Sequence, residues 1–162
     1  MSGPTRILLV DDDRDDIEVA LRAARREQLP VTITVFHDGR DVLDALGVDG
    51  DRESRARING NGTSPASRLR PHAIFLDLRM PRIDGWEILR RLREDPHTRG
   101  IPVVVQSWST RPEDIERCYA LGANSFVAKR MTPNNPGNYF VDAVRYWIQL
   151  NQTPYSGSPT EL

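Results

Sequence analysis

The chain has 162 residues, 38% of them hydrophobic and 28% charged, a composition typical of one soluble globular domain. Lys and Arg (22) nearly balance Asp and Glu (23), so the net charge of −1 excludes a general electrostatic attraction to nucleic acid or to an anionic membrane surface. A single cysteine (Cys118), the lack of a signal-peptide pattern and the lack of an apolar run of membrane-spanning length together predict a cytoplasmic protein.

Short apolar runs alternate with segments of helical periodicity along the chain. The first run, Ile7–Val10, is apolar on both faces, as expected of a buried parallel strand. Apolar residues then recur at i, i+3, i+4 and i+7 from Ile17 to Ala24, which predicts an amphipathic helix. Further strands are predicted at residues 31–36, 73–76, 101–105 and 125–128. The helices that follow them are expected to bury Val42, Leu43 and Leu46; Gly85, Ile88, Leu89 and Leu92; Ile115, Cys118 and Tyr119; and Phe140, Val144, Trp147 and Ile148.

Five strands and five helices in strict alternation predict an α/β fold, a doubly wound five-stranded parallel sheet of the (βα)5 type with helices on both faces. We expect one domain over residues 1–150. Residues 49–70 are rich in Gly, Asn, Ser and Arg and are expected to form a flexible insert, and the tail at residues 151–162 is expected to be disordered. Thr110 and Glu113 have the spacing of a capping box, which predicts that the fourth helix begins there.

Polar residues follow the strands at the ends where an open parallel sheet binds its ligands. Asp11 and Asp12 come directly after the first strand, and Asp77 comes after the third. Ser107 follows the fourth strand, and Lys129 follows the fifth. Carboxylate oxygens suit Mg²⁺, which uses few protein ligands and keeps several waters for a substrate phosphate. The spacing therefore predicts a magnesium site beside one hydroxyl and one ammonium group.

The stretch Ile74–Gly85 reads IFLDLRMPRIDG, an apolar strand followed by an aspartate, Met-Pro and Asp-Gly. With the polar residues at the other strand ends, in this order, it resembles the receiver domains of two-component response regulators over residues 5–150. The resemblance implies a flavodoxin-like fold, in agreement with the alternation of elements. The opening Leu8–Asp16 and the insert before the third strand are similar to regulators that partner phytochrome-like histidine kinases.

The resemblance implies a phosphorylation switch that catalyses only its own phosphorylation and dephosphorylation. Asp77 is the expected phosphoacceptor, which attacks the phosphoryl group of a phosphohistidine on a partner histidine kinase. Asp11 and Asp12 are expected to hold Mg²⁺ together with Asp77 and the backbone carbonyl of Arg79. Phosphoryl transfer depends on in-line positioning and on neutralisation of charge, which such a site supplies.

The resemblance also implies a switch on the other side of the acceptor. Ser107 and Lys129 are expected to bind phosphoryl oxygens, and Phe126 is the expected aromatic residue that turns inward when Ser107 moves. Two residues depart from the family. Arg130 stands where most receivers have proline, so we expect a trans peptide bond and a locally different loop. Trp108 stands where the family usually has a small residue. Two effects are open, shielding of the acyl phosphate from water and small donors or a narrower approach for the kinase, and our hypothesis is that Trp108 slows hydrolysis of phospho-Asp77.

Two other functions stay open at this point. A pseudo-receiver, which would act as an interaction scaffold without phosphate, is favoured by Trp108 and Arg130 and opposed by the intact acceptor set. An aspartate-nucleophile phosphatase would carry a second aspartate two residues after the nucleophile Asp77. Arg79 occupies that position, which counts strongly against this enzyme class. Turnover of a generic phosphate ester distinguishes that enzyme class from the other two functions.

The expected partners are proteins. They are a histidine kinase and an unidentified downstream protein, because no output segment follows residue 150. The last predicted helix is aromatic on more than one side, which leaves open a homodimer through that helix and the neighbouring surface. The arginines of the insert indicate a solvated loop rather than a nucleic-acid patch. Asp13, Asp15 and Asp16 are interpreted as helix-start residues, favoured by the helix dipole.

Overall fold

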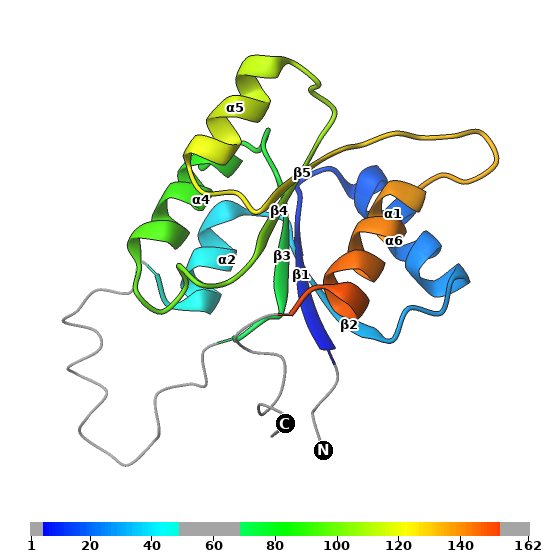
Figure 1. Ribbon diagram of the computed structural model, residues 1–162, viewed down its shortest axis with the longest axis horizontal. Helices are drawn as coiled ribbons and strands as arrows, with labels where there is room; N and C mark the ends of the chain where they lie inside the picture. The colour runs from blue at the N-terminus through cyan, green and yellow to red at the C-terminus, as the bar shows by residue number, and fades with distance from the viewer. Residues whose placement is uncertain (1–4, 49–68, 153–162) are drawn as a thin grey trace, which may run out of the picture.

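The computed structural model describes residues 5–48 and 69–152. The predicted insert at residues 49–70 and the predicted tail at 151–162 lie almost entirely outside these ranges, so both stay predictions. Within the described ranges the chain alternates strands and helices in the predicted order (Figure 1). None of the helices found there is long and apolar enough to span a membrane.

A five-stranded parallel sheet runs through the middle of the molecule, with the strand order β2-β1-β3-β4-β5. This order, in which the chain first moves to one edge and then crosses back to build the other, is that of flavodoxin-like doubly wound sheets. The predicted fold class is therefore confirmed. The strands are β1 (Thr5–Val10), β2 (Val31–Phe36), β3 (Ala73–Asp77), β4 (Val103–Ser107) and β5 (Ser125–Ala128).

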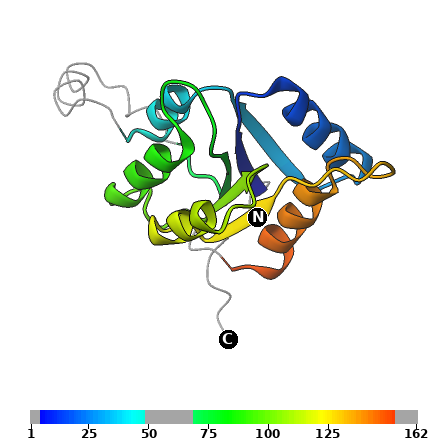
Figure 2. The same ribbon diagram turned by 90° about the horizontal axis from the view of Figure 1, so that it is seen from above.

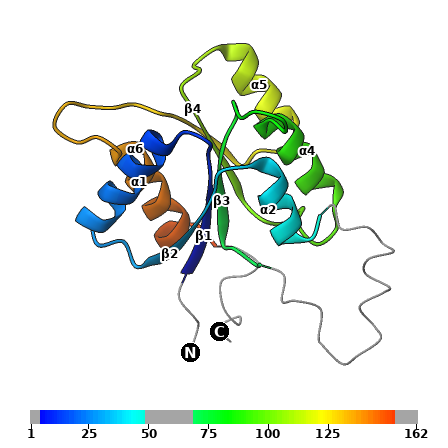
Figure 3. The same ribbon diagram turned by 180° about the vertical axis from the view of Figure 1, so that it is seen from behind.

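Helices cover both faces of the sheet, α1 and α6 on one face and α2, α4 and α5 on the other (Figures 2 and 3). Alternate residues of each strand feed the two cores that result. In β3, Phe75 packs towards α1 and α6, whereas Leu76 packs towards α2 and α4. The helices are α1 (Arg14–Arg26), α2 (Gly39–Leu46), α4 (Gly85–Glu94), α5 (Pro112–Ala120) and α6 (Asn138–Arg145), and a π-helical turn, η2 (Tyr146–Leu150), continues α6.

The start and the inner face of α5 differ from the prediction. The helix begins at Pro112 without a side-chain cap, so the capping box expected from Thr110 and Glu113 is wrong. Proline is favoured at the first helical position, and here it sets the start. Cys118 is fully buried as predicted, but Tyr119 is 51% exposed. Successive helical residues point about 100° apart, so the two side chains cannot share one inner position.

β3 and β4 extend further at their carboxyl ends than predicted. β4 begins at Val103 rather than at residue 101, because Pro102 has no backbone N–H to give to the ladder, and it continues through Ser107. β3 likewise includes Asp77. Two of the predicted site residues are therefore held by the hydrogen-bonded sheet itself, which is a more rigid support than a loop.

The last helix is aromatic on both its buried and its exposed sides, as predicted. Phe140, Val144 and Trp147 are buried against the sheet. Tyr146 is 51% exposed and Leu150 is 73% exposed. The homodimer through this surface stays a prediction.

Candidate functional site

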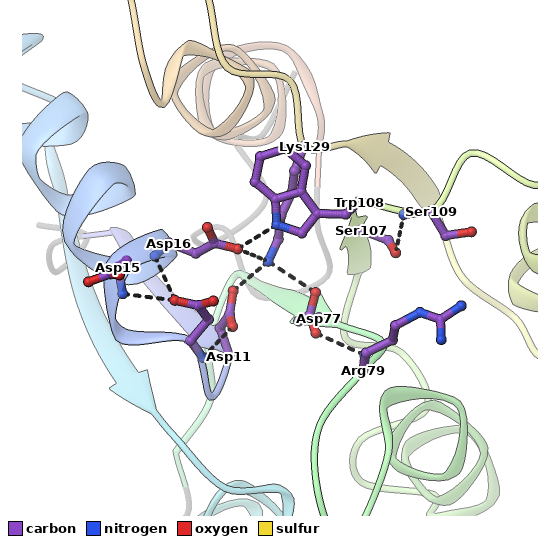
Figure 4. A network of polar contacts seen from close by, with 10 residues as sticks. Asp11, Asp15, Asp16, Asp77, Arg79, Ser107, Trp108, Ser109 and Lys129 are labelled. Atoms are coloured by element: carbon purple, nitrogen blue, oxygen red, sulfur yellow. Dashed lines mark hydrogen bonds and ion pairs between the residues drawn. The ribbon is translucent and has the colours of Figure 1, made fainter.

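Side chains from several strand ends meet at one edge of the sheet (Figure 4). The register of β1 and β3 pairs Val10 with Leu76, so the residues that follow, Asp11 and Asp77, stand side by side. Lys129, directly after β5, reaches both of them. These groups line a cavity of about 170 Å³. Its lining consists of Asp11, Asp12, Asp13, Asp16, Asp77, Arg79, Ser107, Trp108 and Lys129.

The ammonium group of Lys129 is the centre of the polar network. Its Nζ lies 2.7 Å from Asp11 Oδ2, 2.8 Å from Asp16 Oδ2 and 3.0 Å from Asp77 Oδ1. The contacts with Asp11 and Asp16 are hydrogen bonds, and the contact with Asp77 is an ion pair. The lysine side chain is only 2% exposed, and a buried charge needs such partners. The backbone N–H of Lys129 also donates to the carbonyl of Ser107 at 2.8 Å, which ties the end of β5 to β4.

Asp77 is held through both of its carboxylate oxygens. Oδ1 faces Lys129, and Oδ2 accepts a hydrogen bond from the backbone N–H of Arg79 at 2.8 Å. The Asp-Gly pair requires glycine at position 85 for a steric reason. A Cβ at Gly85 would lie 2.2 Å from the carbonyl oxygen of Asp77 and 2.7 Å from the Cα of Leu78. Glycine therefore lets α4 begin directly against the backbone of the acceptor strand.

Burial sets the electrostatics of the cavity. Desolvation raises the pKa of Asp11 to about 6, against the opposing attraction of Lys129. Desolvation also raises the pKa of Asp77. Burial disfavours the charge of Lys129 too, but the attraction of Asp77 and Asp11 outweighs it and raises the pKa of Lys129, which stays an ammonium. Lys129 therefore compensates only part of the buried carboxylate charge.

Three of the carboxylates fit a metal ion. One oxygen from each of Asp11, Asp12 and Asp77 lies within 4.8 Å of the other two. Asp12 is exposed, so the group is open to water on one side. Oxygen donors with an open side suit a hard divalent cation that retains water ligands. Burial raises the pKa of Asp11, and a cation bound beside it would favour the ionised carboxylate instead.

Ser107 and Trp108 form the β4 side of the cavity. Ser107 is buried, and its Oγ accepts a hydrogen bond from the backbone N–H of Ser109 at 3.1 Å. Trp108 is 52% exposed, and its Nε1 donates to Asp16 Oδ2 at 2.8 Å. The ring therefore reaches from the end of β4 to α1, next to Lys129 (Figure 4).

Two residues of the predicted set do not line the cavity. Phe126 in β5 is half-buried and packs against the core beneath α4 and α5. Arg130 is exposed. The peptide bond that joins it to Lys129 is trans, as predicted, since the described ranges contain no cis peptide bond. The roles of Phe126 as a switch and of Arg130 as a modulator stay predictions.

Sequence reasoning interpreted Asp16 as a helix-start residue and did not predict its contacts with Lys129 and Trp108. Asp13 caps α1 as expected, since its side chain accepts hydrogen bonds from the backbone N–H groups of Asp15 and Asp16. The side chain of Asp16, however, does more than start the helix, because it is buried against Lys129. A signal was available in the sequence. Asp16 lies four residues before Ala20, so it extends the buried stripe of α1 towards the strand ends.

Known proteins resemble the chain in sequence. Residues 61–136 match the response regulator receiver domain. The probable methanogenesis regulatory protein FilR2 of Methanothrix harundinacea is 30% identical over 151 residues, which cover 93% of this chain and 88% of FilR2. The response regulator Rcp1 of Synechocystis is 29% identical over 151 residues, which cover 93% of this chain and 94% of Rcp1.

Solved structures resemble the chain over nearly their whole length. The phosphorylated cyanobacterial phytochrome response regulator RcpA is similar with a TM-score of 0.77 at 27% identity, covering 94% of this chain and 99% of RcpA. The Mn²⁺-bound form of Rcp1 is similar with a TM-score of 0.73 at 26% identity, covering 93% of this chain and 99% of Rcp1. One relative thus carries a phosphoryl group, and the other binds a divalent cation.

Proposed function

The chain belongs to the response regulator receiver domain family, and we propose that it is a phosphorylation-operated response regulator whose receiver domain spans residues 1–150. Asp77 is its phosphoacceptor, and a histidine kinase is its donor. The observation that carries the proposal is the buried contact between Asp77 and Lys129 beside the carboxylates of Asp11 and Asp12. An acceptor carboxylate, a cation for the phosphoryl group and oxygen ligands for a metal are what this reaction needs.

The reaction moves a phosphoryl group from a histidine nitrogen to a carboxylate oxygen of Asp77. The O–P bond forms as the N–P bond breaks, and the histidine nitrogen keeps the electron pair of the broken bond. Lys129 and the backbone N–H of Arg79 hold the carboxylate from two sides, so its direction is set before the donor arrives. Lys129 then pairs with one phosphoryl oxygen, and the hydroxyl of Ser107 hydrogen-bonds another.

We propose Mg²⁺ as the cofactor, held by Asp11, Asp12 and Asp77 with the backbone carbonyl of Arg79. When bound, it neutralises part of the negative charge that the phosphoryl group brings. Aspartates outnumber cationic residues in the cavity lining, which favours a doubly charged cation. The Mn²⁺-bound form of Rcp1 supports a divalent cation for a protein of this fold.

The phosphoryl group would be read out through the surface of α5, β5 and α6. Ser107 moves towards the phosphoryl group, and the half-buried Phe126 turns further inward, so a local change in charge biases a two-state surface. Trp108 limits the access of water to the acyl phosphate, and Arg130 shapes the loop after β5.

The pairing of RcpA with phytochrome signalling supports a phytochrome-like histidine kinase as the partner. The exposed Tyr146 and the neighbouring surface would form a homodimer contact, and the protein would work in the cytoplasm.

Incubation with acetyl phosphate and Mg²⁺, followed by measurement of the intact mass, tests the proposal. The wild-type protein is expected to gain the mass of one phosphoryl group, and EDTA is expected to prevent the gain. Asp77→Asn is expected to stay unmodified. Asp15→Asn is the matched control, because Asp15 is an exposed aspartate that does not line the cavity, and it should be modified at the wild-type rate.

Each competing function predicts a different result, in this experiment or in an assay of ester turnover. A pseudo-receiver leaves the wild-type protein unmodified. A phosphatase turns over a generic phosphate ester such as p-nitrophenyl phosphate, and we expect no such turnover. Modification that persists in Asp77→Asn contradicts the assignment of the acceptor.

A further inference from the structure

Trp108 is tied across the cavity to a distant part of the chain. Its Nε1 donates to Asp16 Oδ2 at 2.8 Å and so links the end of β4 to the first turn of α1. The indole lines the cavity that contains Asp77 while 52% of the residue is exposed (Figure 4). A side chain that is half in water is held weakly by packing alone. A hydrogen bond to a carboxylate, which is stronger than one between neutral groups, is therefore its main anchor.

Asp16 is positioned independently of Trp108. Asp16 is buried, with 8% of its side chain exposed, and its Oδ2 lies 2.8 Å from the ammonium of Lys129 as well. Its backbone N–H donates to the capping carboxylate of Asp13 at 3.2 Å, which fixes the first turn of α1. The ion pair and the cap hold Asp16 on two sides. The carboxylate of Asp16 is therefore held in place without Trp108, and it in turn positions the indole of Trp108.

We propose that Asp16 is a positioning residue that holds the indole of Trp108 across the acceptor cavity and thereby slows hydrolysis of phospho-Asp77. The inference rests on the proposed function, because it concerns the lifetime of the phosphoryl group. In hydrolysis a water oxygen attacks the phosphorus, the bond from phosphorus to the Asp77 oxygen breaks, and the carboxylate leaves with the electron pair. An indole anchored at the cavity narrows the approach of that water.

Asp16 has two other ways to affect hydrolysis. Its negative charge lines the cavity that would hold the phosphoryl group, and it is a partner of Lys129. Both effects act without Trp108, so they persist when the indole is removed. An effect that passes through the indole disappears in that background. A double-mutant cycle between Asp16 and Trp108 separates the two cases.

The cycle uses the wild-type protein, Asp16→Ala, Trp108→Ala and the double variant. Each is phosphorylated with acetyl phosphate and Mg²⁺ and freed of donor, and loss of the phosphoryl mass is followed with time. We expect each single variant to lose phosphate severalfold faster than the wild-type protein, and the double variant to be no faster than Trp108→Ala. An unchanged rate in Asp16→Ala overturns the inference. A double variant whose acceleration equals the product of the two single effects also overturns it.

The indole N–H signal of Trp108 in ¹H–¹⁵N NMR spectra tests the anchor without phosphate. The chain has three tryptophans, and the Trp108 signal is the one missing from Trp108→Phe. In Asp16→Ala we expect this signal to shift and its proton to exchange faster with solvent, while the signals of Trp86 and Trp147 stay in place. Asp16→Asn has the same shape and an amide oxygen that accepts the bond, so it should retain most of the protection. A Trp108 signal that is unchanged in Asp16→Ala overturns the anchor.

The two sets of results separate this inference from the proposed function. A wild-type protein that accepts no phosphate refutes the proposed function. A wild-type protein that is phosphorylated, with an Asp16→Ala variant that decays at the wild-type rate, refutes only the role of Asp16.

Discussion

The buried carboxyl group of Asp11 predicts an unusual dependence of stability on pH in the metal-free protein. Desolvation raises its pKa from 3.8 to about 6, in spite of the attraction of Lys129. A rise of about two pKa units corresponds to about 3 kcal/mol of free energy between the two protonation states. This amount is large beside the about 5–15 kcal/mol that hold a typical domain folded.

The sign follows from which state holds the proton. The folded-state pKa of Asp11 is the higher one, so between about pH 4 and pH 6 the folded protein keeps a proton that the unfolded chain has released. The contribution of Asp11 to stability is therefore largest below about pH 4 and is lost as the pH rises to about 6. Above that pH the folded protein has to accommodate a buried, ionised Asp11.

Magnesium should reverse much of this loss at neutral pH. A cation beside Asp11 and Asp77 favours their ionised forms, and a hundredfold excess over the dissociation constant adds about 2.7 kcal/mol to the free energy of unfolding. Protons compete with the metal for the carboxylates, so the gain should be smaller near pH 5 than near pH 7.

Urea unfolding between about pH 4 and pH 7, with EDTA or with MgCl₂, measures both effects. Asp11→Asn has nearly the same shape but no titrating group, so the wild-type free energy minus that of the variant isolates this carboxyl. With EDTA, that difference should fall by up to about 3 kcal/mol as the pH rises. Asp15→Asn, which removes an exposed carboxylate outside the cavity, should leave the profile unchanged. Parallel profiles for the wild-type protein and Asp11→Asn, or equal stabilisation of both by MgCl₂, would refute the reasoning.

Three further predictions concern the frame of the site. Gly85→Ala should destabilise the protein by about 3 kcal/mol in urea unfolding, because the new Cβ would lie 2.2 Å from the Asp77 carbonyl oxygen. The higher helix propensity of alanine adds at most about 1 kcal/mol of stability and cannot offset that overlap. Equal stability of the two proteins would contradict this. Arg93→Lys should lower the free energy of unfolding by about 2 kcal/mol in the same assay. The guanidinium donates hydrogen bonds to the carbonyl oxygens of Gly122 and Ile101, and a lysine ammonium cannot reproduce this planar pair of donors. An unchanged unfolding midpoint would show that these hydrogen bonds contribute little. Cys118 should react with a thiol reagent only as fast as the protein unfolds, because the thiol is fully buried and desolvation raises its pKa to about 11. Rapid labelling of the folded protein would contradict its place in the core.

Much of this fold was predictable because strand burial and helix periodicity leave direct traces in the sequence. Ile7–Val10 is apolar on both faces since helices cover both sides of β1. The acceptor cavity was predictable for a related reason. Parallel strands bring their carboxyl ends to one edge, so residues as far apart as Asp11, Asp77 and Lys129 had to approach one another once the alternation of elements was recognised.

The features that escaped prediction depend on competition between local signals or on packing across the molecule. At the start of α5, the capping-box spacing of Thr110 competes with Pro112, and the proline prevails. The contact of Asp16 with Trp108 depends on how α1 lies against the end of β4, which no local pattern encodes. The sequence does indicate that Asp16 is buried, because this carboxylate continues the buried stripe of α1, but it does not indicate the contact with Trp108.

Mapping the phosphoryl group to a single residue tests the central claim most directly. The protein is phosphorylated with acetyl phosphate and Mg²⁺, the acyl phosphate is reduced with borohydride, and the modified residue is located by peptide mass spectrometry. We predict that reduction converts Asp77, and no other aspartate, to homoserine, and that Asp77→Asn yields none. Modification at another residue, or none in the wild-type protein, would contradict the assignment of Asp77 as the phosphoacceptor.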